Sequence, residues 1–214
     1  FSNKLKRSAF EAYFTILTVL NTDIFYNYEY AFYDSHLVSE FEKFKSHYIR
    51  FSTKPFDFLN IQAGLGTGNE IAYREEIPEL GDRFSFNTSI EVTLNNNLRI
   101  KPSVNFSRLK KLDSQEYFFD GYIARFDIRY QFTSSLNLRV ISEYNEFSDQ
   151  FFVQPLISWR PNSDTIFYLG GNQNYIDEFV DYNSPNYRVN KSQLFLKFQY
   201  LIKSWYYTSN PIWF

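Results

Sequence analysis

The chain has 214 residues, a net charge of −2 and aromatic side chains at 21% of its positions. The near-neutral charge gives no strong field that would favour binding to nucleic acid or to an anionic surface. Cysteine is absent, which excludes disulfides, thiolate metal sites and a catalytic cysteine. No run of about 18 apolar residues occurs, so no transmembrane helix is expected.

Alternation of apolar and polar residues with a period of two predicts β-strands along the whole chain. In chain order, the eleven predicted strands are Ser8–Leu20, Ile24–Tyr33, Phe44–Thr53, Phe58–Thr67, Arg83–Leu94, Leu98–Leu109, two strands within Gly121–Phe147 on either side of Thr133-Ser134-Ser135, Phe151–Arg160, Thr165–Ile176 and Lys191–Ile202. Asp34–Lys43, Gly68–Asp82 and Lys110–Asp120 are expected to be polar connections between strands.

The clearest alternation lies in Gly121–Phe147. Phe126, Ile128, Leu138 and Val140 fall on one face, and charged residues such as Arg125 fall on the other. A soluble barrel turns its apolar face inward, whereas a tilted strand of about 10 residues also crosses a bilayer with its apolar face toward lipid. The length of the strands and the charge of the polar face favour the second arrangement. We therefore predict an all-β fold, an antiparallel transmembrane β-barrel over residues 1–202.

The predicted connections alternate between short turns and longer loops, as on the two rims of a bacterial outer-membrane barrel. Eleven is an odd number, whereas such single-chain barrels have an even number of strands. Either the tail holds one more strand, or N-terminal strands belong to a longer parent protein. We favour the second explanation and expect this chain to be part of a larger barrel. Pro102 and Pro155 lie inside predicted strands and predict a bulge or a local break. The aromatic tail 203–214 is predicted to be periplasmic or interfacial.

One part of the chain resembles a known family. The runs "SRLKKLDSQEYFFDGYIARFDIRYQFTSSLNLRVISEYNEF", "VQPLISWRPNSDTIFYLGGNQNY" and "LFLKFQYL" are similar to the end of large Gram-negative outer-membrane proteins. Those proteins join an N-terminal domain like family-9 carbohydrate-binding modules to a C-terminal barrel of unknown function. The resemblance covers roughly residues 100–202 and is most specific over Tyr122–Phe132 and Ser158–Tyr168. The tail after Ile202 departs from the family's ending.

The resemblance implies a longer parent protein and a location in the Gram-negative outer membrane. It implies saccharide binding only through the N-terminal module, which this chain does not contain. It gives no catalytic residue that could be carried over.

Charged side chains on the polar faces of the strands are the first candidate site. The predicted lumen-facing charges are Glu29, Arg50, Glu91, Arg99, Lys101, Arg125, Asp127, Arg129, Arg139, Glu143, Arg160 and Lys197. They could line a selective pore, or they could form cross-strand ion pairs that fix the register. We favour ion pairs because both signs are interspersed. Arg125, Arg129 and Arg139 form the most basic patch, which predicts a preference for anions if the charges line a pore.

Two predicted loops give weaker candidates. The acidic residues of Gly68–Asp82 could hold Ca²⁺, but their spacing does not match an EF-hand and a solvated acidic loop is favoured. The second loop, Asn172–Tyr187, combines aromatic and polar side chains that could bind a sugar ring or could equally be ordinary exposed loop residues. Its candidate ligand-binding residues are Asn172, Asn174, Tyr175, Asp177 and Tyr182. No resident metal or cofactor is expected.

Catalysis is not supported by the sequence. His36 is expected in a loop, and His47 is expected on the opposite strand face from Ser46 and Ser52, so no serine has an activating histidine. The glycines of Gly64–Gly68 lack the strand–helix context and the lysine of a phosphate loop, and they are expected to give close packing or room in the lumen.

Three functions follow as hypotheses. The first is a pore, carrier or scaffold in the outer membrane. The second is a surface glycan-binding module anchored by a plugged barrel, and the third is a soluble lipocalin-like binder. The expected partners are membrane lipid, other outer-membrane or periplasmic subunits, and glycans, but not nucleic acid.

Overall fold

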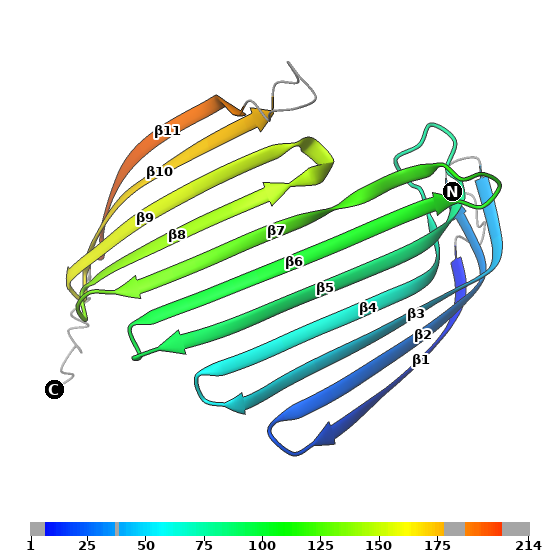
Figure 1. Cartoon of the computed structure of the whole chain (residues 1–214), viewed down its shortest axis with the longest axis horizontal. Helices are drawn as coiled ribbons and strands as arrows, with labels where there is room; N and C mark the ends of the chain where they lie inside the picture. The colour runs from blue at the N-terminus through cyan, green and yellow to red at the C-terminus, as the bar shows by residue number, and fades with distance from the viewer. Residues whose placement is uncertain (1–6, 37–38, 178–186, 203–214) are drawn as a thin grey trace, which may run out of the picture.

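The computed structural model describes residues 7–36, 39–177 and 187–202, and it forms one antiparallel sheet in which each strand pairs with its neighbours in the chain (Figure 1). The strands are β1 (Arg7–Thr18), β2 (Thr22–His36), β3 (Ser39–Phe56), β4 (Leu59–Ile71), β5 (Leu80–Leu94), β6 (Leu98–Lys111), β7 (Tyr117–Gln131), β8 (Leu136–Asn145), β9 (Gln150–Asn162), β10 (Thr165–Asp177) and β11 (Tyr187–Tyr200). A short 3₁₀ turn, η1 (Glu146–Ser148), joins β8 to β9. No helix in the described residues is long and apolar enough to cross a membrane.

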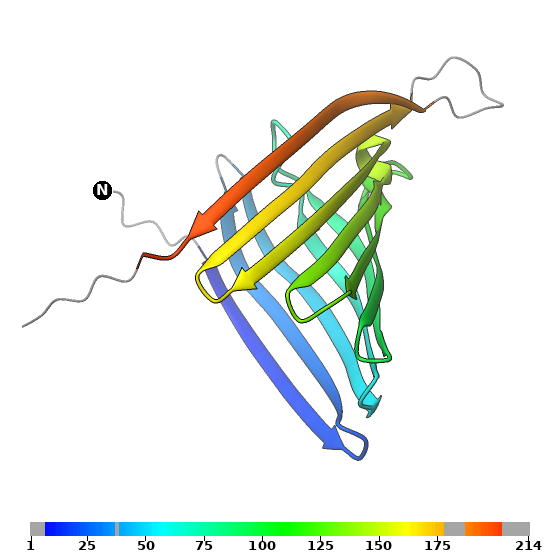
Figure 2. The same ribbon diagram turned by 90° about the vertical axis from the view of Figure 1, so that its left-hand side faces the viewer.

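The described strands form a single curved layer, which Figure 2 shows from one end. β1 and β11 are its two edges, and they are not paired with each other. The prediction of an all-β antiparallel fold is therefore confirmed. The predicted closure into a barrel is not present among the described strands.

The two faces of the sheet differ in chemistry and in crowding. On one face lie apolar side chains that remain exposed to solvent, among them Phe126 at 49% and Leu196 at 76%. On the other face lie the charged residues, and some apolar side chains there are buried, such as Ile141 at 3%. One hollow on this second face is lined by residues from six consecutive strands, β5 to β10. Side chains converge in this way only on the inside of a curved sheet, so the charged face is concave and the apolar face is convex.

The fold has almost no interior. The buried apolar residues of the described chain are Ala31, Phe41, Ile71, Ala72, Leu109 and Ile141. The accessible surface is 16094 Å², compared with roughly 10,400 Å² for a compact monomer of this mass. Stable domains normally bury the apolar face of a sheet against a second layer. Here the described residues supply no such layer.

Several predicted loops are shorter in the structure because the strands continue through them. Asp34–Lys43 is not a connection: β2 reaches His36, β3 begins at Ser39, and Tyr33 pairs with Glu42. Likewise Asn69 pairs with Asp82 at the far ends of β4 and β5. Polar residues can continue a backbone ladder, since the hydrogen bonds do not depend on side-chain polarity. The contrast between short and long connections is therefore weaker than predicted.

The two strand prolines each interrupt the ladder on one side, because proline lacks a backbone donor. The β5–β6 pairs Ser89–Ser103 and Val92–Ile100 flank a gap at Pro102, while Pro102 itself pairs with Phe126 of β7. Between β9 and β10, a similar gap lies beside Pro155. The register is the same on both sides of each gap, so the predicted local break is confirmed, without a bulge.

Candidate functional site on the concave face

The twelve charged residues predicted from the alternation share one face of the sheet. The register aligns Arg99 with Arg129 and Arg129 with Arg139, and it aligns Arg125 with Glu143. Residues two positions apart on a strand share a face, which places the other predicted charges on the same side. This face is the concave one described above.

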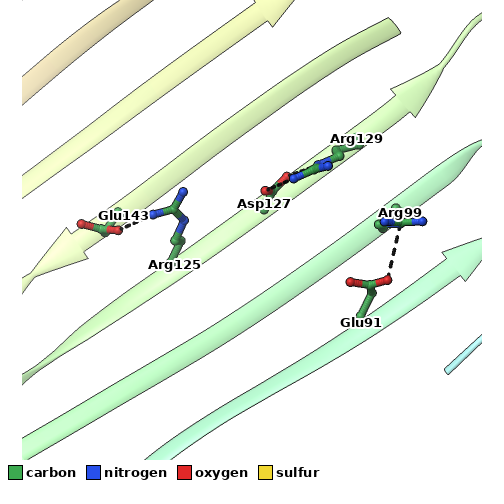
Figure 3. A network of polar contacts seen from close by, with 6 residues as sticks. All are labelled: Glu91, Arg99, Arg125, Asp127, Arg129 and Glu143. Atoms are coloured by element: carbon green, nitrogen blue, oxygen red, sulfur yellow. Dashed lines mark hydrogen bonds and ion pairs between the residues drawn. The ribbon is translucent and has the colours of Figure 1, made fainter. Parts of the chain in front are cut away.

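Most of these charges are paired across or along the strands (Figure 3). Arg125 lies 3.2 Å from Glu143, and Arg99 lies 3.5 Å from Glu91. The Arg129 guanidinium donates two hydrogen bonds to Asp127, at 3.1 and 3.0 Å. The arginines of these pairs are about half exposed, so each pair contributes at most about 1 kcal/mol. The pairs support the interpretation that alternating charges help to fix the register.

The remaining predicted charges have other surroundings. Arg50 lies 3.6 Å from Asp23, and Glu29 is paired with Arg7. The Lys197 ammonium lies 5.8 Å from the centre of the Tyr168 ring, a cation–π contact between β11 and β10. Lys101 is aligned with Asp127, and Arg160 is exposed near the end of β9.

A hollow of about 500 Å³ lies at the end of the concave face where the short turns are. Arg99, Arg129 and Arg139 contribute guanidinium groups to it, and Asn97, Asn137, Ser158 and Tyr168 are among its other lining residues. Its lining contains no carboxylate. We call this hollow the turn-end cavity. It is a water-accessible cationic hollow.

A second hollow, of about 750 Å³, lies at the opposite end of the concave face. The connection between β4 and β5 covers it, because Tyr73 and Glu75 share its lining with Leu109 and Phe119. Burial, and then the Asp34 carboxylate, raise the pKa of the Tyr73 phenol above its ordinary value. We call this hollow the loop-end cavity. Its lining is largely aromatic and aliphatic, with Glu70, Glu75 and Arg74 as its charged residues.

Glycines on the concave face make room for aromatic rings that lie across them. An ideal Cβ placed on Gly64 of β4 would lie 2.5 Å from the Tyr48 hydroxyl and 2.8 Å from the Asn87 amide. Asn87 of β5 donates a 3.4 Å hydrogen bond to that hydroxyl, so Tyr48 of β3 crosses β4 to reach β5. Gly170 is covered by Phe195 in the same way. The expectation that these glycines give close packing is supported.

This packing gives a testable expectation for Gly64. Gly64→Val is expected to destabilise the folded chain by about 1–3 kcal/mol, because the added atoms displace Tyr48 and Asn87. Urea unfolding of the chain folded in detergent micelles measures the change. The penalty should shrink in a Tyr48→Ala background, where one of the two overlapping side chains is gone. An equal penalty in both backgrounds would refute the contact.

The predicted loop residues lie elsewhere than expected. Asn172, Asn174, Tyr175 and Asp177 belong to strand β10, not to a loop, and Tyr182 lies outside the described residues. The alternation of β10 continues to Asp177 because β11 pairs with it throughout. Asn172 and Asn174 are on the concave face, while the Tyr175 ring lies 6.0 Å from that of Phe151. These residues do not form one cluster. The tail 203–214 also lies outside the described residues.

The two histidines lie on neighbouring strands, β2 and β3. His36 is the last residue of β2 rather than a loop residue, and it pairs with Ser39 through the backbone. The His47 Nδ1 lies 2.8 Å from the Tyr26 hydroxyl on the convex face, whereas Ser46 is aligned with Glu29 on the concave face. Among the residues described, no three His, Asp or Glu side chains gather to hold a metal ion.

Sequence reasoning missed the uncharged members of both cavities. Asn137, Ser158 and Tyr168 reach the turn-end cavity from three strands, and the register aligns Asn137 with Ser158 and Ser158 with Tyr168. The alternation assigns them to the polar face, but only the turn lengths determine that they form one row. The connection between β4 and β5 covers the loop-end cavity, and the alternation of apolar and polar residues does not predict this.

Comparisons of the chain with protein-family models, curated proteins and solved structures give no match. The family resemblance in the C-terminal half therefore stays a prediction.

Proposed function

We propose that the chain is part of an integral β-barrel of the Gram-negative outer membrane, acting as a pore or carrier whose concave face lines the aqueous passage. The observation that carries this proposal is the reversed polarity of a single-layer sheet, with apolar side chains on the convex face and ion pairs on the concave face. In water, such a sheet would expose a large apolar surface, which soluble monomers rarely do. In a bilayer, the same surface is solvated by lipid.

Strand length supports the same proposal. The described strands have 10 to 18 residues, while about 9 to 11 tilted residues cross the hydrocarbon core. Every described strand is long enough, and the longer ones would extend beyond the membrane. A scaffold role in a larger outer-membrane assembly is compatible with the same geometry.

Lipid contact can be tested with a single tryptophan on each face. With Trp205 and Trp213 replaced by phenylalanine, Trp159 on the convex face is expected to be quenched by brominated phosphatidylcholine after folding into vesicles. Its side chain is 47% exposed in the described structure. The control carries Trp159→Phe and Tyr168→Trp, which moves the probe to the concave face. Equal quenching of both probes, or a monodisperse chain in detergent-free buffer, would contradict the proposal.

A binding module anchored in the membrane is the second candidate, and the loop-end cavity favours it. Tyr73, Phe119 and Phe147 place aromatic rings beside Glu70 and Glu75 in this hollow. Aromatic faces with nearby hydrogen-bonding groups suit a sugar ring. Conductance across planar bilayers separates the candidates, since an open passage conducts and a plugged barrel does not. The lipocalin-like hypothesis has least support, because it needs the apolar side chains on the concave face.

A further inference from the structure

We propose that the turn-end cavity is a binding site for a small oxyanion, of the phosphate or carboxylate class, held by Arg99, Arg129 and Arg139. This inference deepens the proposed function by naming the class of solute, and it rests on that function only for the passage of the solute. Binding itself is a property of the folded chain.

The three arginines form one row across the sheet. Arg129 of β7 is aligned with Arg99 of β6 on one side and with Arg139 of β8 on the other. Neighbouring strands are about 4.8 Å apart, so the three side chains start within roughly 10 Å of one another. Like charges directly opposite each other repel. An anion placed between them relieves this repulsion.

The carboxylates of the concave face neutralise only part of this row. Glu91 lies 3.5 Å from Arg99, and Asp127 accepts two hydrogen bonds from Arg129. Arg139 has no carboxylate oxygen within 4.0 Å among the described residues. Its Nε is buried and has no hydrogen-bond partner in the described chain. Among the three arginines, Arg139 therefore has the charge and the Nε–H donor that an anion could pair with.

The hollow around Arg139 is suited to an oxyanion. Its volume of about 500 Å³ admits a phosphate with part of its hydration shell, and Asn97, Asn137 and Ser158 add neutral groups at its wall. Guanidinium groups bind carboxylate and phosphate oxygens through paired N–H donors. The cavity lies at the end of the concave face, so a solute in the passage can reach it.

Arg125 is the natural comparison within the same face. It lies on β7, as Arg129 does, but its guanidinium is 3.2 Å from Glu143 and it does not line the turn-end cavity. The side chains of Arg125 and Glu143 are 43% and 19% exposed. Removing Arg125 subtracts the same unit of charge from the concave face as removing Arg139. The two variants therefore separate a local site from a general positive field.

The experiment measures binding of sodium pyrophosphate, and then of succinate, to the full chain folded in detergent micelles at low ionic strength. Isothermal titration calorimetry is expected to give one site for at least one of these probes. Arg139→Gln should weaken binding at least tenfold, and Arg125→Gln less than threefold. Arg139→Lys, which retains the charge but loses the planar fork, should give an intermediate loss. Circular dichroism checks that each variant keeps its β-sheet content.

Several outcomes would overturn the proposal: no binding of either probe by the unsubstituted chain, equal losses for the Arg125 and Arg139 variants, or unchanged binding by a folded Arg139 variant. If Arg139→Gln does not fold, the Arg139→Lys variant is the test. Weaker binding by this variant supports the site, and unchanged binding refutes it. Failure of the proposed membrane function would appear separately, as a chain that is monodisperse without detergent.

Discussion

Phe126→Arg is expected to destabilise the chain folded in phosphatidylcholine vesicles by about 2–4 kcal/mol. Phe126 lies near the middle of β7 on the convex face, where its side chain is 49% exposed. If lipid covers this face, an arginine near the bilayer midplane costs about 2–4 kcal/mol. If water covers it, a half-exposed position tolerates the change to within about 0.5 kcal/mol. Urea titration of the vesicle-folded chain, followed by tryptophan fluorescence, measures the difference.

Asn105→Arg is the matched control for this substitution. Asn105 lies near the middle of β6, aligned with Ile123, and belongs to the concave face. The same charge added there meets water, so the midpoint of unfolding should hardly move. Equal effects of the two substitutions would contradict the assignment of lipid to the convex face.

Gly68→Ala is expected to destabilise the fold by about 3 kcal/mol or more. Gly68 has a φ of +125°, a conformation that residues with a Cβ rarely adopt. An ideal Cβ at this position would also overlap the Lys45 backbone oxygen and lie 2.6 Å from the Ser46 Cα. Because these are backbone atoms of β3, no side chain can rotate away to make room. Strain and overpacking therefore add.

Gly171→Ala provides the comparison, because this position has no left-handed φ and an added Cβ would make one tight contact rather than overlap backbone atoms. Its ideal Cβ would meet only the Gln193 carbonyl oxygen, at 3.2 Å. Unfolding in urea should shift little for Gly171→Ala and strongly for Gly68→Ala. Comparable shifts for the two variants would show that glycine content, rather than the geometry at Gly68, controls stability.

The strand pattern was predictable from the sequence because most strands alternate in polarity over much of their length. Phe126 and Arg125 could be assigned to opposite faces from their positions alone, and the register of Arg125 with Glu143 agrees with that assignment. The ends of the strands were harder to predict. Glu42 and Asn69 lie in polar segments, yet they extend the ladders, since backbone pairing at a strand end does not require apolar side chains.

The candidate site was predictable only in part. The alternation identified Arg99, Arg129 and Arg139 as polar-face residues, but it could not show that they form one row. That alignment depends on the lengths of the β6–β7 and β7–β8 connections, and a change of one residue in either connection would shift it. The absence of a carboxylate partner for Arg139 within the described chain depends in turn on the same register. Side-chain pairing is thus a consequence of turn length that composition does not reveal.

The direction of the two edge strands limits how this sheet can form a ring. β1 and β11 are separated by ten antiparallel pairings, so they run the same way. Joining them directly would create one parallel seam in an otherwise antiparallel ring, and a ring of two such chains joined β1 to β11 would contain two. A closed ring in which every pair is antiparallel requires an odd number of additional strands between β11 and β1.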